Sequence, residues 1–342
     1  MTDTAVPVQP ATKPSLVAGF LALVGGVALV VVALEVDTSM LARIVAGLAG
    51  GGLAYRGLDR LVARLVGRPV ETDLWLAAVW VGLVVGAAIF ADLLPLSEAS
   101  DTSKTLTEPS RATPDLWSSH PFGTDTQALD VLGGVIYGAR VSLQVSFFAV
   151  AIGTVVGGLI GISAGYFGGR LDSIIGVLTD SMLAFPPLIL LLAVVTAVEP
   201  NVVSIGLALA LLGVPTYTRL ARANTISLVH REFVLAARTL GAGHGRIILR
   251  ELVPNVIRPL LSYSFIIVAV LIVAEASLSF LGVGISRPTP TWGNMISAGQ
   301  GEIRTSPHLV FIPSLVMFLT VFALNRIGDA ARRRWDPRES AI

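Results

Sequence analysis

Side chains that could carry out catalysis or bind a metal are few and widely spaced in this sequence. The stretch Gly161-Ile-Ser-Ala-Gly165 has the G-x-S-x-G spacing of a nucleophile elbow, but it lies in a glycine-rich apolar run typical of a helix. A nucleophile elbow needs a strand-to-helix turn and a partner histidine. The histidines are dispersed along the chain: His120, His230, His244 and His308. Cysteine is absent, so we expect no catalytic residue and no metal site.

Nucleotide hydrolysis by this chain is excluded by the absence of a phosphate-binding motif. No G-x-x-x-x-G-K-[ST] occurs, and neither lysine, Lys13 or Lys104, is near a glycine-rich turn. We expect this chain to bind no cofactor and to be no enzyme. Any energy for its function must then come from another chain.

Three polar residues stand in or near apolar runs: Asp180, Glu275 and Asn325. A carboxylate at the centre of a bilayer costs about 2.5–3.5 kcal/mol on insertion scales, so such groups face protein or a water-filled path. For Asp180 and Glu275, pairing or helix-end hydrogen bonding is favoured over direct substrate contact. All three remain candidates for polar groups of a pore or of the membrane-embedded core.

Composition places these residues in an all-α integral membrane protein, since 54% of residues are hydrophobic and 14% charged. About 20 apolar residues span the hydrocarbon layer as a helix. Seven clear runs and one shorter run with Arg43 near its end, 39–55, predict about eight transmembrane helices. The runs lie near 15–35, 39–55, 74–95, 141–165, 173–198, 202–220, 259–282 and 308–328.

The cations predict the orientation of these spans. With eight crossings and cytosolic N- and C-termini, most arginines fall inside. The outside keeps Lys104, Arg111, Arg140, Arg287 and Arg304. If the run 39–55 did not cross the membrane, the predicted orientation of every later span would be inverted. The first run carries no small-residue cleavage site and is interpreted as an anchor rather than a secretory signal.

Two segments outside the spans have a distinctive charge pattern. The loop 96–140 is predicted to be external and holds more acidic than basic residues. The linker 56–72 spaces Arg56, Arg60, Arg64 and Arg68 four apart among apolar residues, which predicts a basic amphipathic helix on the inner lipid surface. Ordinary positive-inside anchoring is the favoured interpretation of these arginines.

Within the spans, glycines and prolines mark special packing. Glycine recurs every fourth residue at Gly153, Gly157, Gly161 and Gly165, and we favour intramolecular helix packing over an intersubunit seam for this strip. Pro186-Pro187 interrupts the run 173–198, which predicts a kink or a pore-lining break.

The loop 221–258 is the most informative segment, because it is charged and lies between two apolar runs. Helix formers from Arg231 to Leu240 end at a Gly241–Gly245 break, and a second helix is expected from Arg246 until Pro254 stops it. Apolar residues recur there at helical spacing: Phe233, Leu235, Leu240, Ile247, Ile248 and Leu252. A solvated loop would not need them, so we expect them to fit a groove on a partner protein. We call residues 231–254 the elbow.

The elbow resembles the cytoplasmic "EAA" loop of bacterial ABC-importer permeases. The matching positions are Ala236, Ala237, Gly241 and Pro254, whereas Leu235 stands where that motif often has glutamate and Val253 replaces a leucine. Further stretches resemble the C-type subunit of the dipeptide/oligopeptide permease group, although Leu129 replaces its common arginine. They are His120–Asp125 with Asp130–Leu132 and Ile136–Leu143, Leu278–Gly284 with Pro288–Met295, and Asn325–Asp329 with Asp336–Arg338.

The resemblance covers 73–342 and implies a six-helix type I permease core there, with 1–72 as an N-terminal extension carrying two further transmembrane helices. It implies a multi-pass subunit of the bacterial cytoplasmic membrane, forming half of a pore. The implied partners are a second homologous permease subunit, one or two ABC ATPase subunits, an extracytoplasmic peptide-binding protein and membrane lipid. Nucleic acid is not among them.

The resemblance also assigns roles. ATPase coupling is expected on the elbow residues Phe233, Ala236, Ala237, Gly241, Ala242, Gly243, His244, Arg246 and Pro254. Phe280 and Trp292, in the signature after the fifth core helix, are candidates for an external gate.

The expected function is therefore ATP-driven import of di- or oligopeptides without bond making or breaking by this chain. A secondary transporter or channel fits the hydropathy but leaves the elbow unexplained. A membrane-tethered DNA-binding protein has too little soluble chain for a folded module. Within the family, dipeptides, longer peptides, glutathione and nickel chelates all remain open as substrates.

Overall fold

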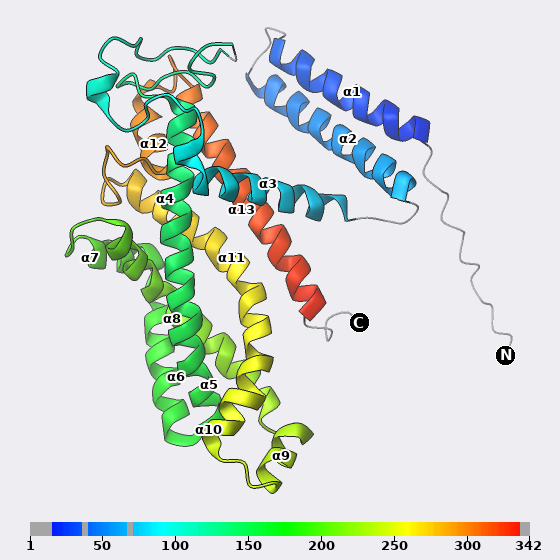
Figure 1. Ribbon diagram of the computed structural model, residues 1–342, viewed down its shortest axis with the longest axis vertical. Coiled ribbons are helices and arrows are strands. Elements are labelled where there is room, and N and C mark those ends of the chain that lie inside the picture. The colour runs from blue at the N-terminus through cyan, green and yellow to red at the C-terminus, as the bar shows by residue number, and fades with distance from the viewer. Residues whose placement is uncertain (1–15, 36–39, 67–70, 116, 336–342) are drawn as a thin grey trace, which may run out of the picture. The chain divides into compact units, whose positions relative to one another are not determined.

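The computed structural model describes residues 16–35, 40–66, 71–115 and 117–335, which contain helices and no β-strand. Lys13, Arg68 and the stretch Asp336–Arg338 lie outside these residues. Contacts divide the chain into two compact units, Met1–Leu76 and Ala77–Ile342 (Figure 1).

The first unit is built from two helices packed side by side, α1 (Leu16–Glu35) and α2 (Met40–Val66). A Cβ atom at Gly26 would overlap the backbone nitrogen of Ala54, and one at Gly57 would overlap that of Leu23. Only glycine permits this close antiparallel approach.

The helix α2 differs from the prediction of a span that ends at 55 and a separate linker helix from 56. It runs without a break from Met40 to Val66. No proline interrupts Tyr55-Arg56-Gly57, and Gly57 packs against α1, so the chain has no local reason to bend there.

The second unit holds the remaining helices. The helix α3 (Thr72–Ile89) begins at the end of the first unit and continues into the second. The longer helices are α4 (Val131–Ile152), α5 (Gly158–Phe167), α6 (Gly169–Ala184), α7 (Pro187–Val195), α8 (Val202–Leu228), α11 (Val253–Phe280) and α13 (His308–Trp335). The short ones are η1 (Ala91–Leu93), η2 (Thr102–Lys104), η3 (Gly153–Gly157), α9 (Glu232–Thr239), α10 (His244–Arg246), η4 (Ile247–Leu252), α12 (Trp292–Gly299) and η5 (Gln300–Glu302).

Five helices of the described residues are long and apolar enough to cross a membrane, or six if a bent pair counts as one span. They are Thr72–Ile89, Val131–Phe167, Val202–Leu228, His244–Phe280 and His308–Trp335, and the bent pair is Gly169–Ala184 with Pro187–Val195. Several extend well beyond the predicted apolar runs, because helices can continue past the hydrocarbon layer with polar residues. The predicted loop 96–140 accordingly ends at Asp130, where α4 begins.

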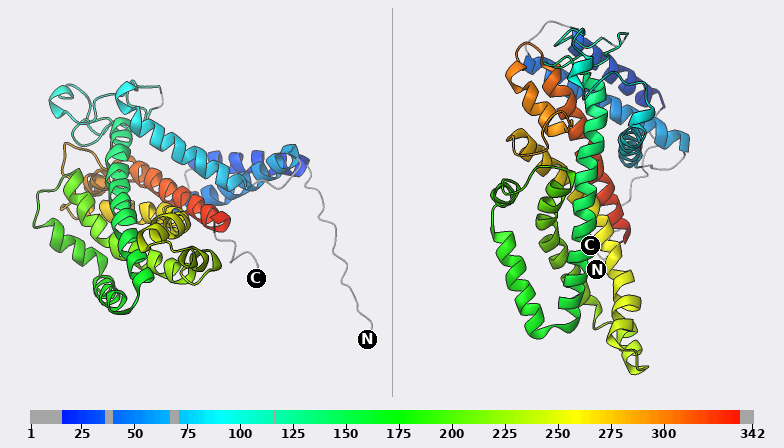
Figure 2. Two further views of the ribbon diagram at one scale, coloured as in Figure 1. Left: turned by 60° about the horizontal axis from the view of Figure 1, so that its bottom comes forward. Right: turned by 60° about the vertical axis from the view of Figure 1, so that its left-hand side comes forward.

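The Pro186-Pro187 pair breaks its span, as the sequence indicated. The axes of α6 and α7 meet at 89°, and both views in Figure 2 show α7 turning away from the line of α6. Proline pushes the preceding residue out of the helical region, and Phe185 has extended angles of φ −72° and ψ 136°. Pro187 then fits the first turn of α7, where its missing N–H costs nothing.

The four-residue glycine strip packs within the chain, which confirms the favoured interpretation. A Cβ at Gly161 would overlap the carbonyl oxygen of Thr218, and one at Gly165 would lie 2.8 Å from the Cβ of Thr225. We call this contact of η3 and α5 with α8 the glycine seam. Ser163 donates its hydroxyl to the Leu159 carbonyl oxygen inside α5, at 2.8 Å, so the G-x-S-x-G match forms no nucleophile elbow.

The segment between α3 and α4, residues 90–130, is fastened to the second unit by ion pairs. Arg140 of α4 bonds Asp92 at 2.8 Å, Arg287 bonds Asp125 at 2.7 Å, and Glu302 accepts from Arg111 at 2.6 Å. We call residues 90–130 the cap segment.

Candidate coupling elbow and membrane cavity

The elbow turns at Gly241. This residue has φ +82°, a left-handed conformation that favours glycine, and a Cβ atom added there would meet no neighbouring atom within 4 Å. The Ala242 N–H donates to the Ala237 carbonyl at 3.0 Å, and the Gly241 N–H donates to the Arg238 carbonyl at 3.0 Å. These bonds close the C-terminus of α9. Gly243 follows as the extended residue before α10.

Pro254 does not end a helix, contrary to the sequence prediction. The helix that starts at His244 continues through Pro254 to Phe280, for 37 residues. Its turn over Ile247–Leu252 is a π-helix, in which the Val253 N–H donates to the Ile248 carbonyl. A widened turn accommodates the proline ring, which would clash in a regular α-helix.

The apolar residues of the elbow divide between the chain's own core and its surface. Ile247 and Leu252 are fully buried within the second unit, so the prediction that they fit a partner's groove is wrong for these two. Phe233, Leu235 and Leu240 are exposed, at 38%, 45% and 87%. Val234, which no sequence pattern singled out, anchors α9 with no exposed surface.

The remaining elbow residues lie at or near the surface. Ala236, Gly241, Gly243, His244, Arg246 and Pro254 are exposed, and Ala237 and Ala242 are half-buried. Exposed apolar and small residues thus share the outer side of the elbow, while Val234, Ile247 and Leu252 hold its inner side.

Tyr166, at the end of α5, contacts two residues of the elbow, and sequence reasoning missed it. Its hydroxyl lies 2.8 Å from His244 Nδ1, and the Arg238 guanidinium lies 5.4 Å from the centre of its ring. One buried tyrosine thereby contacts both helices that flank Gly241. The only sequence signal was a polar aromatic residue at the end of an apolar run, just before Gly168-Gly169.

Two arginine–carboxylate pairs link α6 to α8. Arg219 Nη2 lies 2.5 Å from Asp180 Oδ1, with both side chains largely exposed, and Arg222 pairs with Asp172 through two nitrogens. Asp180 is therefore ion-paired in this chain.

Glu275 and Asn325 are held by hydrogen bonds. Glu275 has no exposed surface and accepts hydroxyl hydrogens from Ser142 of α4, at 2.8 Å, and from Ser279, at 2.7 Å. Asn325 donates to the carbonyl of Val321 in its own helix at 2.8 Å. Asp180, Glu275 and Asn325 thus come from three helices, α6, α11 and α13, and these bonds join each of them to different partners.

Phe280 and Trp292 differ sharply in exposure. Trp292 is fully buried, and its indole N–H donates to the Val135 carbonyl of α4 at 3.0 Å. Phe280 is 41% exposed. It lines an apolar cavity of about 350 Å³ together with Leu188, Ala276 and Met317, and Trp292 is not part of that lining.

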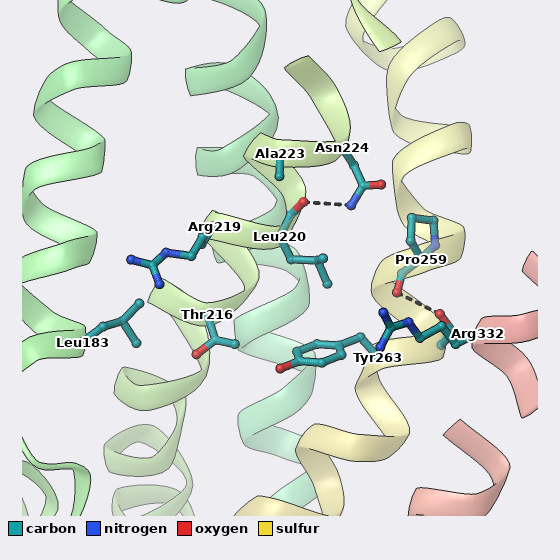
Figure 3. A pocket seen from close by; sticks show the side chains of 10 residues that line it. Leu183, Thr216, Arg219, Leu220, Ala223, Asn224, Pro259, Tyr263 and Arg332 are labelled. Atoms are coloured by element: carbon teal, nitrogen blue, oxygen red, sulfur yellow. Dashed lines mark hydrogen bonds between the residues drawn. The ribbon is translucent and has the colours of Figure 1, made fainter. Parts of the chain in front are cut away.

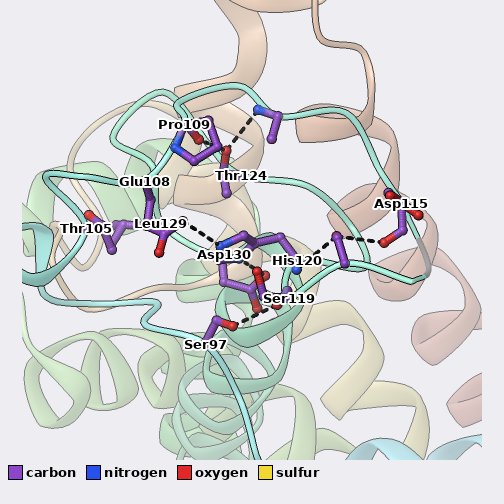
Figure 4. Close-up of polar contacts among 12 residues, drawn as sticks. Ser97, Thr105, Glu108, Pro109, Asp115, Ser119, His120, Thr124, Leu129 and Asp130 are labelled. Atoms are coloured by element: carbon purple, nitrogen blue, oxygen red, sulfur yellow. Dashed lines mark hydrogen bonds and ion pairs between the residues drawn. The ribbon is translucent and has the colours of Figure 1, made fainter.

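A histidine–carboxylate cluster fixes the end of the cap segment to α4 (Figure 4). Asp130 accepts from the Gly133 N–H at 2.6 Å as the N-cap of α4, and its other oxygen lies 3.1 Å from His120 Nδ1. Glu108 lies 3.5 Å from His120 Nε2. Burial raises the pKa of Asp130 above its usual value, against these hydrogen bonds. The described residues contain no group of three histidine or acidic side chains able to hold a metal ion.

A larger cavity of about 500 Å³ lies among α6, α8, α11 and α13 (Figure 3). Its lining is Leu183, Thr216, Arg219, Leu220, Ala223, Asn224, Pro259, Ser262, Tyr263 and Arg332. Two of these side chains are arginines and none is acidic.

Sequence comparisons with known proteins identify the family of this chain. The sequence profile of the family described as "Binding-protein-dependent transport system inner membrane component" matches residues 157–340. The dipeptide transport system permease protein DppC of Alkalihalophilus pseudofirmus is 38% identical over 251 residues, which cover 73% of this chain and 81% of that protein. The glutathione transport system permease protein GsiD of Escherichia coli is 35% identical over 265 residues, covering 77% of this chain and 85% of that protein.

A solved inward-facing structure of the MetNI methionine ABC transporter is also similar, with a TM-score of 0.45 and 17% identity, over 59% of this chain and 96% of that chain. The family assignment does not depend on this likeness. It follows from the profile match and from relatives that are similar over most of their own length. This chain belongs to the inner-membrane permease components of binding-protein-dependent ABC transporters, in the dipeptide/oligopeptide group.

Proposed function

We propose that this chain is the permease subunit of an ATP-driven importer of di- or oligopeptides and forms half of its translocation pore. Its family membership supports the transporter role, and the named substrates of its relatives, dipeptides and glutathione, support the peptide class. The chain itself makes and breaks no bonds. Its partners are a second homologous permease subunit, one or two ABC ATPase subunits and an extracytoplasmic peptide-binding protein.

The elbow is the proposed contact with the ATPase, and its surface is the observation that carries this proposal. Phe233, Leu235 and Leu240 expose apolar side chains beside the turn at Gly241. Exposed apolar residues beside a hydrogen-bonded turn suit a groove on another protein. The proposed coupling residues are Phe233, Ala236, Ala237, Gly241, Ala242, Gly243, His244, Arg246 and Pro254. ATP and Mg²⁺ bind to the partner subunits.

In the membrane, we propose eight crossings, comprising six in residues 73–342 and α1 and α2 in the extension 1–72. Both termini and the elbow then lie in the cytosol, and the cap segment lies outside with the binding protein. Phe280 is the proposed external gate, because it is exposed at the end of α11. Trp292 acts there by fixing α12 to α4 through its bond to Val135.

The test is reconstitution of the chain with its co-expressed partners in proteoliposomes, followed by uptake of a radiolabelled dipeptide. We expect uptake to require ATP, the ATPase subunits and the binding protein, and the ATPase to co-purify with the chain in detergent. Uptake by the permease subunits alone, driven by an ion gradient or by the dipeptide gradient, would instead identify a secondary transporter or a channel.

A further inference from the structure

The cavity among α6, α8, α11 and α13 has the size of a small-ligand site. Its volume of about 500 Å³ lies within the range of about 300–1,000 Å³ that is usual for such sites. Polar side chains enter it from three of the four helices, whereas α6 contributes the apolar Leu183. The lining carries two arginines and no carboxylate. Arg219 also pairs with Asp180, which lies outside the lining, and the second guanidinium, that of Arg332, adds the positive charge that favours an anionic group on the ligand.

Several hydrogen-bond donors face this space. The guanidinium of Arg219 has five N–H donors, and Asp180 engages it through Nη2 alone among the described residues. The Tyr263 hydroxyl points into the cavity in Figure 3 and has no hydrogen-bond partner within the described part of the chain. By contrast, the hydroxyls of Thr216 and Ser262 already donate to the carbonyls of Leu212 and Pro259, at 3.2 and 2.9 Å.

Two of the four walls of the cavity, α8 and α11, are the helices that enter and leave the elbow. Thr216 to Asn224 lie on α8, which precedes the elbow, and Pro259 to Tyr263 lie on the helix that leaves it. Leu183 lies two residues before Phe185, where α6 breaks away from α7 at 89°. Discontinuous helices commonly form the substrate sites of transporters. A movement of the elbow would therefore reshape this cavity.

We propose that the cavity is a transit subsite for the C-terminal carboxylate of the transported peptide. Arg332 and Arg219 attract the carboxylate, and the Tyr263 hydroxyl donates a hydrogen bond to it. This inference rests on the proposed function of peptide import. An inner-leaflet phospholipid also offers an anionic phosphate, but its acyl chains need a long apolar groove, and polar side chains from α8, α11 and α13 interrupt this lining.

The test compares a labelled dipeptide with its C-terminal amide, which lacks the carboxylate. Uptake of both is measured with the complete transporter in proteoliposomes, for the wild type and for Arg332→Gln. We expect Arg332→Gln to lower uptake of the free acid about tenfold or more, since a hydrogen bond to a charged group is lost. Uptake of the amide should change little. Tyr263→Phe, which loses a hydrogen bond to the same carboxylate, should lower the acid-to-amide ratio about tenfold.

Any preference of the binding protein itself for the free acid is the same for every permease variant. Only the difference in acid-to-amide ratio between a variant and the wild type is interpreted, so the preference cancels. Arg334→Gln is the matched control: it lies on the same helix, is exposed and does not line the cavity. Its acid-to-amide ratio should equal that of the wild type. Each variant is used only after it co-purifies with its partners, and if Arg332→Gln fails to assemble, Tyr263→Phe carries the test.

The outcomes separate the subsite from the proposed function. An unchanged acid-to-amide ratio in the variants, with ATP-driven uptake by the wild type, overturns the subsite and leaves the importer standing. Absence of uptake by the wild type overturns the importer itself. If Arg332→Gln lowers uptake of both compounds equally, and only in vesicles that contain phosphatidylglycerol, the cavity binds a lipid phosphate and the peptide subsite is wrong.

Discussion

At the scale of single residues, Glu98 shows how the cap segment holds an ionised carboxylate. Glu98 Oε1 accepts from the backbone N–H groups of Asp101, at 3.0 Å, and Ser100, at 3.1 Å, and Lys104 donates to Oε2 at 3.2 Å. The Asp101 amide is the largest cause, and together these donors lower the pKa of Glu98 from 4.5 to about 2. The turn that follows Glu98 is thus organised around a negative charge.

The lowered pKa predicts a loss of local stability in acid. Because the folded pKa of Glu98 is depressed, its contribution is fully present above about pH 4.5 and is lost as the pH falls through about 2. Hydrogen-exchange protection of the Ser100 and Asp101 amides should fall across that window. In Glu98→Gln, protection should be lower at neutral pH and nearly constant down to about pH 2. Equal pH profiles in the two proteins would contradict this account.

Substitutions at Tyr166 are predicted to weaken ATP-driven uptake through their effect on the elbow. Tyr166→Phe removes the hydroxyl from His244 but keeps the ring beneath Arg238. Losing one hydrogen bond of about 0.5–1.5 kcal/mol should reduce ATP-driven uptake a few-fold, and Tyr166→Ala should reduce it further. A double-mutant cycle with His244→Ala should show that the two substitutions are not additive. Strict additivity would show that the contact does not serve transport.

Sequence reasoning could single out His244 but not its partner Tyr166. His244 stands in a recognisable motif, whereas Tyr166 lies 78 residues away and matches no pattern. The same limit applies to Trp292: its position in a signature suggested a gate, but the sequence could not show that the indole is buried against α4. Partners distant in sequence are fixed by helix packing, which periodicity does not specify.

At the scale of elements, the glycine seam predicts a clear difference between two glycines. Gly161→Ala would force a Cβ onto the Thr218 carbonyl, so we expect α5 and α8 to separate and the protein to lose about 1–3 kcal/mol of stability. Gly176→Ala on α6 adds its Cβ to open space, so it should be neutral or slightly stabilising. Thermal melts of the two detergent-solubilised variants make the comparison. Similar melting temperatures would mean that the seam can open without cost.

Two glycines of the elbow, Gly241 and Gly245, provide a matched pair of substitutions. Gly241→Ala places a side chain on a residue with φ +82°, although no neighbour lies within 4 Å of it. The left-handed conformation should cost about 1 kcal/mol or more, tilt α9 relative to α10 and reduce uptake without loss of membrane insertion. Gly245→Ala, in the open first turn of the next helix, should transport normally. If both variants transport alike, the geometry of the turn is not part of coupling.

Element boundaries show what hydropathy can and cannot predict. The apolar runs identified the main membrane helices of the second unit, and Pro186-Pro187 correctly indicated the break between α6 and α7. Pro254 did not stop its helix, because a π-turn over Ile247–Leu252 makes room for the ring. That adjustment depends on the packing of Ile247 and Leu252 in the core, which the local sequence does not reveal.

At the scale of the whole molecule, the division at Leu76 predicts that the extension can be removed. Deletion of residues 1–70 takes away α1 and α2, which belong to the first unit. The second unit has its own buried core, so we expect membrane insertion and peptide uptake to persist. Complete loss of uptake by a normally inserted deletion variant would make the extension part of the transport machinery.

A longer deletion provides the control. Removal of residues 1–90 also takes away α3, including Trp80, whose indole donates to Thr320 of α13 at 3.1 Å, and the buried Ala88. That deletion should abolish uptake or assembly. Both deletions are compared by membrane fractionation before uptake is measured.

The unbroken helix from His244 to Phe280 has a consequence for the permeability barrier. At 1.5 Å per residue, its 37 residues measure about 55 Å. If such a rod pivots about its midpoint by about 5°, its two ends swing in opposite directions by about 2–3 Å each. In the proposed importer one end faces the cytosol and the other carries Phe280. If the importer works as proposed, a tilt of this kind would widen one mouth only while it narrows the other, so solute would pass while the ion gradients across the membrane are preserved.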